Sequence, residues 1–232
     1  MTESATDERQ PAPLDSFFRY ALAIFLISLA VRVLHLSQIR TAPFFQLLMG
    51  DAQSYHTWAQ QIAAGDWIGS DVFYQAPLYP YFLGLVYRLL GDGPMIVRLC
   101  QAVIGSLACV LLALAGWRLF SKPVGILAGL MLAFYAPAIF FDSLIQKSVL
   151  DAFLLCLALA LLGGLTLEPN RRWPWLWVGL TVGCLMLTRE NAMVFVFAIL
   201  FWLLWYQRHL ATRRLVLAGF LLAGLAIVLV PV

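Results

Sequence analysis

Charged residues are scarce in this chain of 232 residues: Asp, Glu, Lys and Arg make up only 12%, whereas 62% of the residues are hydrophobic. Soluble domains carry about 25% charged and roughly 45–50% apolar residues. The shortage of charge therefore excludes a water-soluble globular enzyme and a disordered protein. The composition is typical of a polytopic membrane protein, and the small net charge of +3 matters less than the places where the charges lie.

Several signals that identify other classes of protein are absent. The four cysteines lie in apolar stretches without CxxC spacing, which predicts neither a disulfide framework nor a thiolate metal site. No glycine-rich phosphate-binding loop occurs, which argues against a nucleotide-sugar substrate, and we expect no nucleic-acid partner. No internal repeat and no low-complexity segment is visible either.

What the sequence has instead is a series of seven apolar runs. A helix needs about 20 residues to cross a bilayer, and most of the runs reach that length. They lie at about 17–36, 95–117, 123–141, 145–165, 173–188, 191–206 and 214–231. The first run lacks a small-residue cleavage pattern, which predicts a retained membrane anchor. We divide the chain into a disordered cytoplasmic tail at 1–16 and a membrane module at 17–232.

Basic residues are concentrated in three of the connecting loops, which contain a single acid. These residues are Arg118, Lys122, Arg171, Arg172, Arg208, Arg213 and Arg214. Because cytoplasmic loops carry an excess of Lys and Arg, the three loops are predicted to be cytoplasmic. The loops at 37–94, 142–147 and 188–191 then face outward. This topology predicts a multi-pass protein with its active face outside, and the membrane we expect is a bacterial inner membrane.

Two shorter helical patterns lie within the first external loop. The run 78–90 is apolar but only 13 residues long, and it contains Arg88. Apolar residues also recur at helical spacing within 51–64. We predict that both segments lie along the outer membrane surface. The predicted fold is therefore an all-α polytopic membrane protein with about seven transmembrane helices and two juxtamembrane helices in the first external loop.

The same loop combines carboxylates with aromatic side chains. Its aspartates are Asp51, Asp66, Asp71 and Asp92, and eleven aromatic residues lie in the same loop. Aromatic faces stack on sugar rings, and carboxylates accept hydrogen bonds from sugar hydroxyls or remove a proton. Long loops in compact chains are usually functional or disordered, and the aromatic content of this one argues against disorder. The loop therefore predicts a sugar-binding site.

Five stretches carry a resemblance to a known family. They are GDAQSYHTWA (50–59), GDW (65–67), YQAPLYPYFLGLVYRLLG (74–91), FYAPAIFFDSLIQKSVLDAFLLCLALALL (134–162) and GLTVGCLMLTREN (179–191). In this order they resemble the GT-C membrane glycosyltransferases of the protein mannosyltransferase and aminoarabinose transferase branch. The resemblance implies a polyprenyl-phosphate sugar donor and a glycan, lipid or protein acceptor. Since such relatives continue with further spans and an external domain, we interpret the chain as a truncated or minimal form.

By this resemblance Asp51 matches the acid that serves as general base. Its carboxylate would take the proton of the acceptor hydroxyl as that oxygen attacks the anomeric carbon. The lipid phosphate would leave from the opposite face, so that the configuration inverts. The alternative is that Asp51, which follows Gly50, only caps the next helix. Tyr55, one turn further along, is assigned to substrate binding.

Five more charged residues are candidates for substrate binding. Asp151 is ionisable within a predicted span, which is a functional hypothesis by default; the alternative is a pair with Lys147, four residues earlier. By the resemblance, Arg189 would bind the leaving phosphate, to which a guanidinium donates two parallel hydrogen bonds; the alternative is a contact with lipid head groups. Lys147 and Arg88 are further phosphate candidates, and Asp142 is a further acid.

Metal binding and a second class of function stay open. No second acid follows Asp51, and His56 is the lone histidine of the loop, so we assign no metal ligand, although a divalent metal remains a candidate cofactor. The alternative function is a multi-pass transporter or lipid flippase, which would also hold charges in its spans. Transporters tend to show paired halves and broken spans near the midplane, and no matching halves are visible. Arg32 is expected to extend from the first span to the outer interface.

Overall fold

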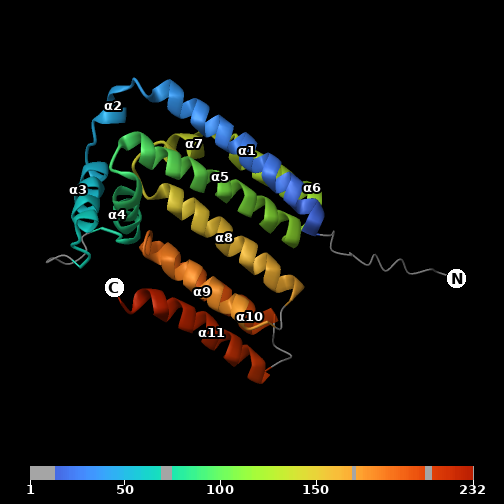
Figure 1. Cartoon of the computed structure of the whole chain (residues 1–232). Coiled ribbons are helices and arrows are strands. Elements are labelled where there is room, and N and C mark those ends of the chain that lie inside the picture. Colours follow the sequence, from blue (N-terminus) through green and yellow to red (C-terminus); the bar gives the residue numbers. More distant parts are fainter. Residues whose placement is uncertain (1–13, 69–74, 169–170, 207–210, 232) are drawn as a thin grey trace.

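A computed structural model describes residues 14–68, 75–168, 171–206 and 211–231 of the chain (Figure 1). Within these ranges the secondary structure is helical and contains no strand, which confirms the all-α class. The helices are α1 (Leu14–Ile39), α2 (Pro43–Gln46), α3 (Asp51–Ala64), α4 (Leu78–Leu90), α5 (Pro94–Leu119), α6 (Lys122–Ala133), α7 (Ala136–Asp142), α8 (Ser148–Leu167), α9 (Trp173–Met186), the 3-10 turn η1 (Glu190–Ala192), α10 (Met193–Tyr206) and α11 (Ala211–Leu229). Of the predicted tail at 1–16, all but the last three residues lie outside the described ranges.

Each of the seven predicted apolar runs is helical. In chain order they correspond to α1, α5, α6 with α7, α8, α9, α10 and α11. By length and composition, α1, α5 and α8 could cross a membrane, and α6 with α7 would make a fourth span in the described chain. The protein is thus polytopic. The count of seven spans is not confirmed, because α9 and the η1–α10 segment are shorter than a full span.

The third run is bent because of a proline. α6 ends at Ala133 and α7 begins at Ala136, and their axes differ by 55°. Inside a continuous helix Pro137 could not donate the hydrogen bond that its position requires. In the first turn of a new helix the missing N–H costs nothing, and Pro137 occupies that place in α7. The bend directs α7 and the following turn toward α5.

α5 lies at the centre of the bundle. Figure 1 shows the long helices α1, α5 and α8 side by side, with α9 and α11 beyond α8. α5 contacts α1, α6 and α8 along its length. The short helices α2, α3 and α4 gather at the end where α5 begins. Because successive long helices alternate in direction, the connection between α7 and α8 and the connection between α9 and η1 lie at the same end.

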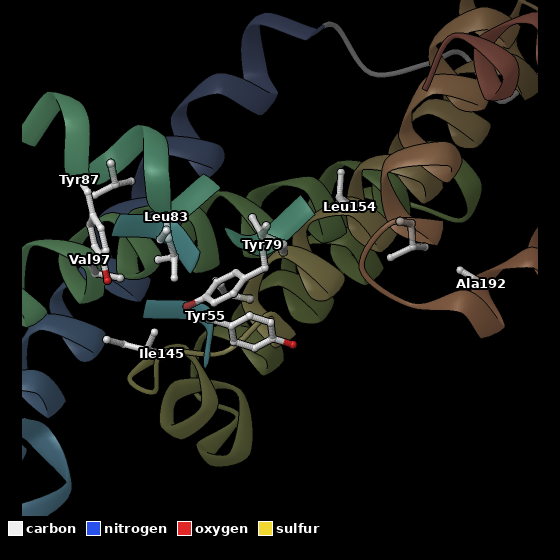
Figure 2. Close-up of a cluster of buried hydrophobic side chains, with 13 residues drawn as sticks. Tyr55, Tyr79, Leu83, Tyr87, Val97, Ile145, Leu154 and Ala192 are labelled. Atoms are coloured by element: carbon white, nitrogen blue, oxygen red, sulfur yellow. The ribbon is translucent and has the colours of Figure 1, made fainter. Parts of the chain in front are cut away.

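A cluster of buried side chains joins α3 and α4 to this end of the bundle (Figure 2). Tyr55 of α3 and Tyr79 of α4 meet edge to face, with ring centroids 5.0 Å apart. Ile145, from the turn before α8, and Leu154 of α8 belong to the same cluster. The structure therefore has both short helices predicted for the first loop and packs them against the long helices.

Glycines permit the closest approach between two helices. A Cβ atom on Gly179 of α9 would lie 2.1 Å from the backbone oxygen of Leu221 in α11. A Cβ atom on Gly224 would lie 2.3 Å from the backbone oxygen of Leu176. α9 and α11 therefore touch backbone to backbone, which is how small residues pack helices in membranes.

We expect Gly179→Ala to destabilise the protein by about 1–3 kcal/mol, because the added methyl group forces α9 and α11 apart. Thermal unfolding of the detergent-purified protein measures the change. Gly219→Ala on α11 is the matched control, because a Cβ atom there meets nothing within 4 Å, and alanine favours the helix. Equal melting temperatures for the two variants would contradict this account of the contact.

Candidate active site

A cleft of about 420 Å³ opens at the end of the bundle that carries α3 and α4. Four segments that lie far apart in the sequence line it. The lining residues are Asp51, Tyr55, Gln75, Ala76, Lys147, Thr188, Arg189, Glu190 and Asn191. The structure thus brings Asp51, Tyr55, Lys147 and Arg189 together at one cleft.

Asp51 is the first residue of α3, and its side chain is exposed in the cleft. Gly50 occupies the N-cap position with φ +59°, which allows the chain to turn sharply into the helix. Because Gly50 holds the N-cap position and Asp51 is already the first residue inside the helix, Asp51 is not the capping residue of α3. Instead, Gln75 Nε2 donates to Asp51 Oδ1 over 3.0 Å. This bond holds one oxygen of the carboxylate of Asp51, a residue that lines the cleft.

Tyr55 lies one helical turn after Asp51, and it is only 3% exposed. Because its ring packs against Tyr79, contact with a substrate would be made through its hydroxyl group. Burial raises the pKa of Tyr55, and the neighbouring carboxylates of Asp51 and Asp151 raise it further. The hydroxyl therefore stays protonated near neutral pH and can donate a hydrogen bond.

Asp151 and Arg189 form an ion pair at the cleft. Arg189 Nε donates to Asp151 Oδ2 over 2.6 Å; the Asp151 side chain is 13% exposed and that of Arg189 is 61% exposed. This pairing replaces the alternative pair of Asp151 with Lys147, which is not seen among the described residues. The other oxygen of Asp151, Oδ1, is buried without a hydrogen-bond partner. Arg189 is thus tied to α8, while its side chain stays largely exposed and lines the cleft.

Lys147 lies at the N-cap position of α8 and lines the cleft. Its backbone oxygen accepts hydrogen bonds from the amides of Leu150 and Asp151, which starts the helix that carries Asp151. Among the described residues, Lys147 makes no ion pair. Within the described ranges, no carboxylate therefore lies at contact distance from this cation of the cleft.

Asp151 does not itself line the cleft and reaches it only through Arg189, and two other sequence candidates lie away from it. Asp142 is 5% exposed and is paired with Arg32, whose Nε lies 2.8 Å from Asp142 Oδ2. The expectation that Arg32 extends to the interface is therefore wrong, because the buried carboxylate holds it inside the bundle. Arg88 is exposed in the last turn of α4 and does not line the cleft.

Sequence reasoning missed the neutral and flanking members of the cleft. Gln75, Thr188 and Asn191 carry no charge that would single them out, and Gln75 acquires its role only through the fold. No group of three His, Cys, Asp or Glu side chains that could hold a metal ion occurs among the residues that the structure describes. His56 Nδ1 instead lies 2.7 Å from the hydroxyl group of Tyr87, a contact that joins α3 to α4.

The site lies in a polytopic helical protein, and its charged side chains lie together at one end of the bundle. This arrangement suits a membrane enzyme that acts at the membrane–water interface. Residues 74–232, more than two thirds of the chain, match the model of the family described as dolichyl-phosphate-mannose-protein mannosyltransferase. The chain belongs to this family and is a membrane glycosyltransferase of the GT-C type. No curated protein and no solved structure matches it. The matched region contains Lys147, Asp151 and Arg189, whereas Asp51 and Tyr55 precede it.

We expect Arg189→Met to destabilise the protein by about 1 kcal/mol, because it leaves the mostly buried carboxylate of Asp151 without a partner. The double variant Arg189→Met with Asp151→Asn should recover most of this loss, as measured by thermal unfolding. Arg171→Met is the matched control, because it breaks an ion pair with Glu168 in which both side chains are more than half exposed, and such pairs contribute little. Additive effects in the double variant would contradict the coupling.

Proposed function

We propose that this cleft transfers a sugar from a polyprenyl-phosphate donor to an acceptor hydroxyl group, with inversion at the anomeric carbon. The observation that carries the proposal is the meeting of Asp51 with Lys147 and Arg189 in one cleft. A base for the acceptor and cations for the departing phosphate are the two groups that such a displacement requires. The family description favours mannose as the sugar and dolichyl phosphate, or a related polyprenyl phosphate, as its carrier.

In this mechanism Asp51 acts as the general base. The acceptor oxygen attacks the anomeric carbon, the bond from that carbon to the phosphate oxygen breaks, and the proton of the hydroxyl group moves to Asp51. The hydrogen bond from Gln75 holds one oxygen of the carboxylate, so that the other can face the acceptor. General base catalysis of this kind contributes about 10²–10⁴-fold to a rate. Direct displacement from the opposite face inverts the configuration.

Lys147 and Arg189 stabilise the charge that develops on the leaving phosphate. Positioned cations are most effective where charge grows in the transition state. Arg189 keeps donors for a phosphate even while its Nε is bound to Asp151, because a guanidinium carries five N–H groups. Lys147 adds a charge that no ion pair within the described chain offsets.

The distribution of basic residues supports an outward-facing site. Arg118, Lys122 and Arg171 lie at the end of the bundle opposite to the cleft (Figure 1). Since basic loops remain in the cytoplasm, the cleft would face the outside or the periplasm. The polyprenyl chain would remain in the bilayer beside the apolar helix surfaces while its phosphate reaches the cleft.

We expect Asp51→Asn to lower the rate of sugar transfer at least about 100-fold, because the amide cannot accept the proton. The measurement is the release of lipid phosphate from radiolabelled dolichyl-phosphate mannose by the purified protein in proteoliposomes, with peptide, lipid and glycan acceptors supplied. Released lipid phosphate reports the reaction whichever acceptor is used.

Asp92→Asn is the matched control for this experiment. Asp92 is an exposed aspartate of the same loop that also accepts a hydrogen bond from a glutamine, Gln60, but it does not line the cleft. Its variant should keep the wild-type rate. Full activity of Asp51→Asn would refute the mechanism, and substrate uptake without lipid-phosphate release would favour a transporter or flippase instead.

A further inference from the structure

The turn 143–147, which connects α7 to α8, is irregular, yet it is packed against the interior of the bundle. Buried backbone oxygens require hydrogen-bond donors, and long-range side chains supply them here. Gln101 Nε2 donates to Asp142 O over 2.8 Å and to Leu144 O over 2.6 Å. Arg98 Nε donates to Ser143 O over 2.7 Å. Three consecutive carbonyl groups are therefore held by two side chains of α5.

The two donor side chains, Arg98 and Gln101, lie on one face of α5. Arg98, Gln101 and Gly105 are spaced by three and four residues, which places them on one side of a helix. Gly105 completes the face, because a Cβ atom there would lie 2.2 Å from Asp142 Oδ2. The missing side chain leaves room for the carboxylate of Asp142 and for Arg32 of α1, which binds it. Arg98 and Gln101 are each about 1% exposed or less.

A further contact links the same glutamine to α4. The hydroxyl group of Tyr79 donates to Gln101 Oε1 over 2.5 Å, and Tyr79 is fully buried. Both ends of the Gln101 amide are therefore engaged, the oxygen by α4 and the nitrogen by the turn. Gln101 thus connects α4 and the α7–α8 turn to α5.

We propose that Gln101, together with Arg32 and Arg98, is a positioning residue for the cleft. These three residues, which we call the turn clamp, fix the 143–147 turn on α5 so that Lys147 faces the cleft. Asp151 follows one turn later on α8 and meets Arg189. The clamp touches neither the cleft nor the substrate. Its catalytic consequence rests on the proposed function, whereas its hold on the turn does not.

Gln101→Met tests the clamp, because methionine matches the length of glutamine and has no donor. Two measurements are made on the full chain. Hydrogen–deuterium exchange of the backbone should become faster in peptides covering 143–151 and stay unchanged in α9 and α11. The catalytic efficiency with dolichyl-phosphate mannose should fall about 10–100-fold, the scale expected when a binding group is displaced by about 1 Å. This fall should include a higher KM for the donor.

Two control variants separate positioning from a general loss of structure. Ser106→Ala removes another buried polar group of α5, whose hydroxyl group binds only Ala102 O of its own helix. Arg118→Met removes a side chain that ties α5 to Ala160 O of α8 at the opposite end. Neither should change exchange at 143–151 or the KM for the donor. If Gln101→Met does not fold, Gln101→Asn is measured in the same way. Asparagine keeps the amide group, but its side chain is one methylene shorter.

The outcomes distinguish the two proposals. Unchanged exchange at 143–151, exchange that rises equally throughout the chain, or a lower kcat with an unchanged donor KM would overturn the role of the clamp. If the wild-type protein releases no lipid phosphate, the proposed function fails, and with it the catalytic consequence of the clamp. Faster exchange confined to 143–151 would still show that Gln101 holds the turn.

Discussion

Most polar groups buried in an apolar helical bundle find their hydrogen-bond partners within the protein, because lipid offers none. This constraint shapes the centre of the molecule. α5 carries Arg98 and Gln101 toward the carbonyl groups of the 143–147 turn, and Gly105 leaves space for the pair of Arg32 with Asp142. The chain can therefore break its helical pattern there while the carbonyl groups of Asp142, Ser143 and Leu144 stay hydrogen-bonded. That break allows α8 to begin at the cleft.

The cleft depends on the alternation of the helices. Asp51, Lys147 and Arg189 are separated by more than a hundred residues in total, but each follows or precedes a long apolar helix at the same end of the bundle. The apolar helices meet these groups at their ends, where Lys147 begins α8 and Asp151 of α8 binds Arg189. They set the end of the bundle at which each loop emerges, and the buried contacts of Tyr55, Tyr79 and Ile145 then fix how the loops approach each other.

Much of this organisation could be predicted from the sequence. The seven apolar runs are helices, and Asp51, Lys147 and Arg189 do line one cleft, since apolar periodicity and charge placement are local signals. The failures concern contacts between distant residues. Arg32 was expected at the interface, but its partner Asp142 lies 110 residues away, which no local pattern reveals. Gln75 and Gln101 were missed for the same reason, because an uncharged amide acquires its role only from the fold.

The charges at the cleft indicate why the position of the turn matters. Arg189 already shares its charge with Asp151, and Asp51 is held by a neutral amide. Lys147 is the remaining cation of the cleft, and it makes no ion pair among the described residues. An incoming phosphate would therefore gain most from Lys147, since its attraction is not offset by a carboxylate in contact. Coulomb attraction between unit charges falls with distance, so a shift of the turn would weaken this interaction more than any other in the cleft. In the proposed mechanism, the hold of α5 on the turn therefore serves the chemistry as well as the fold.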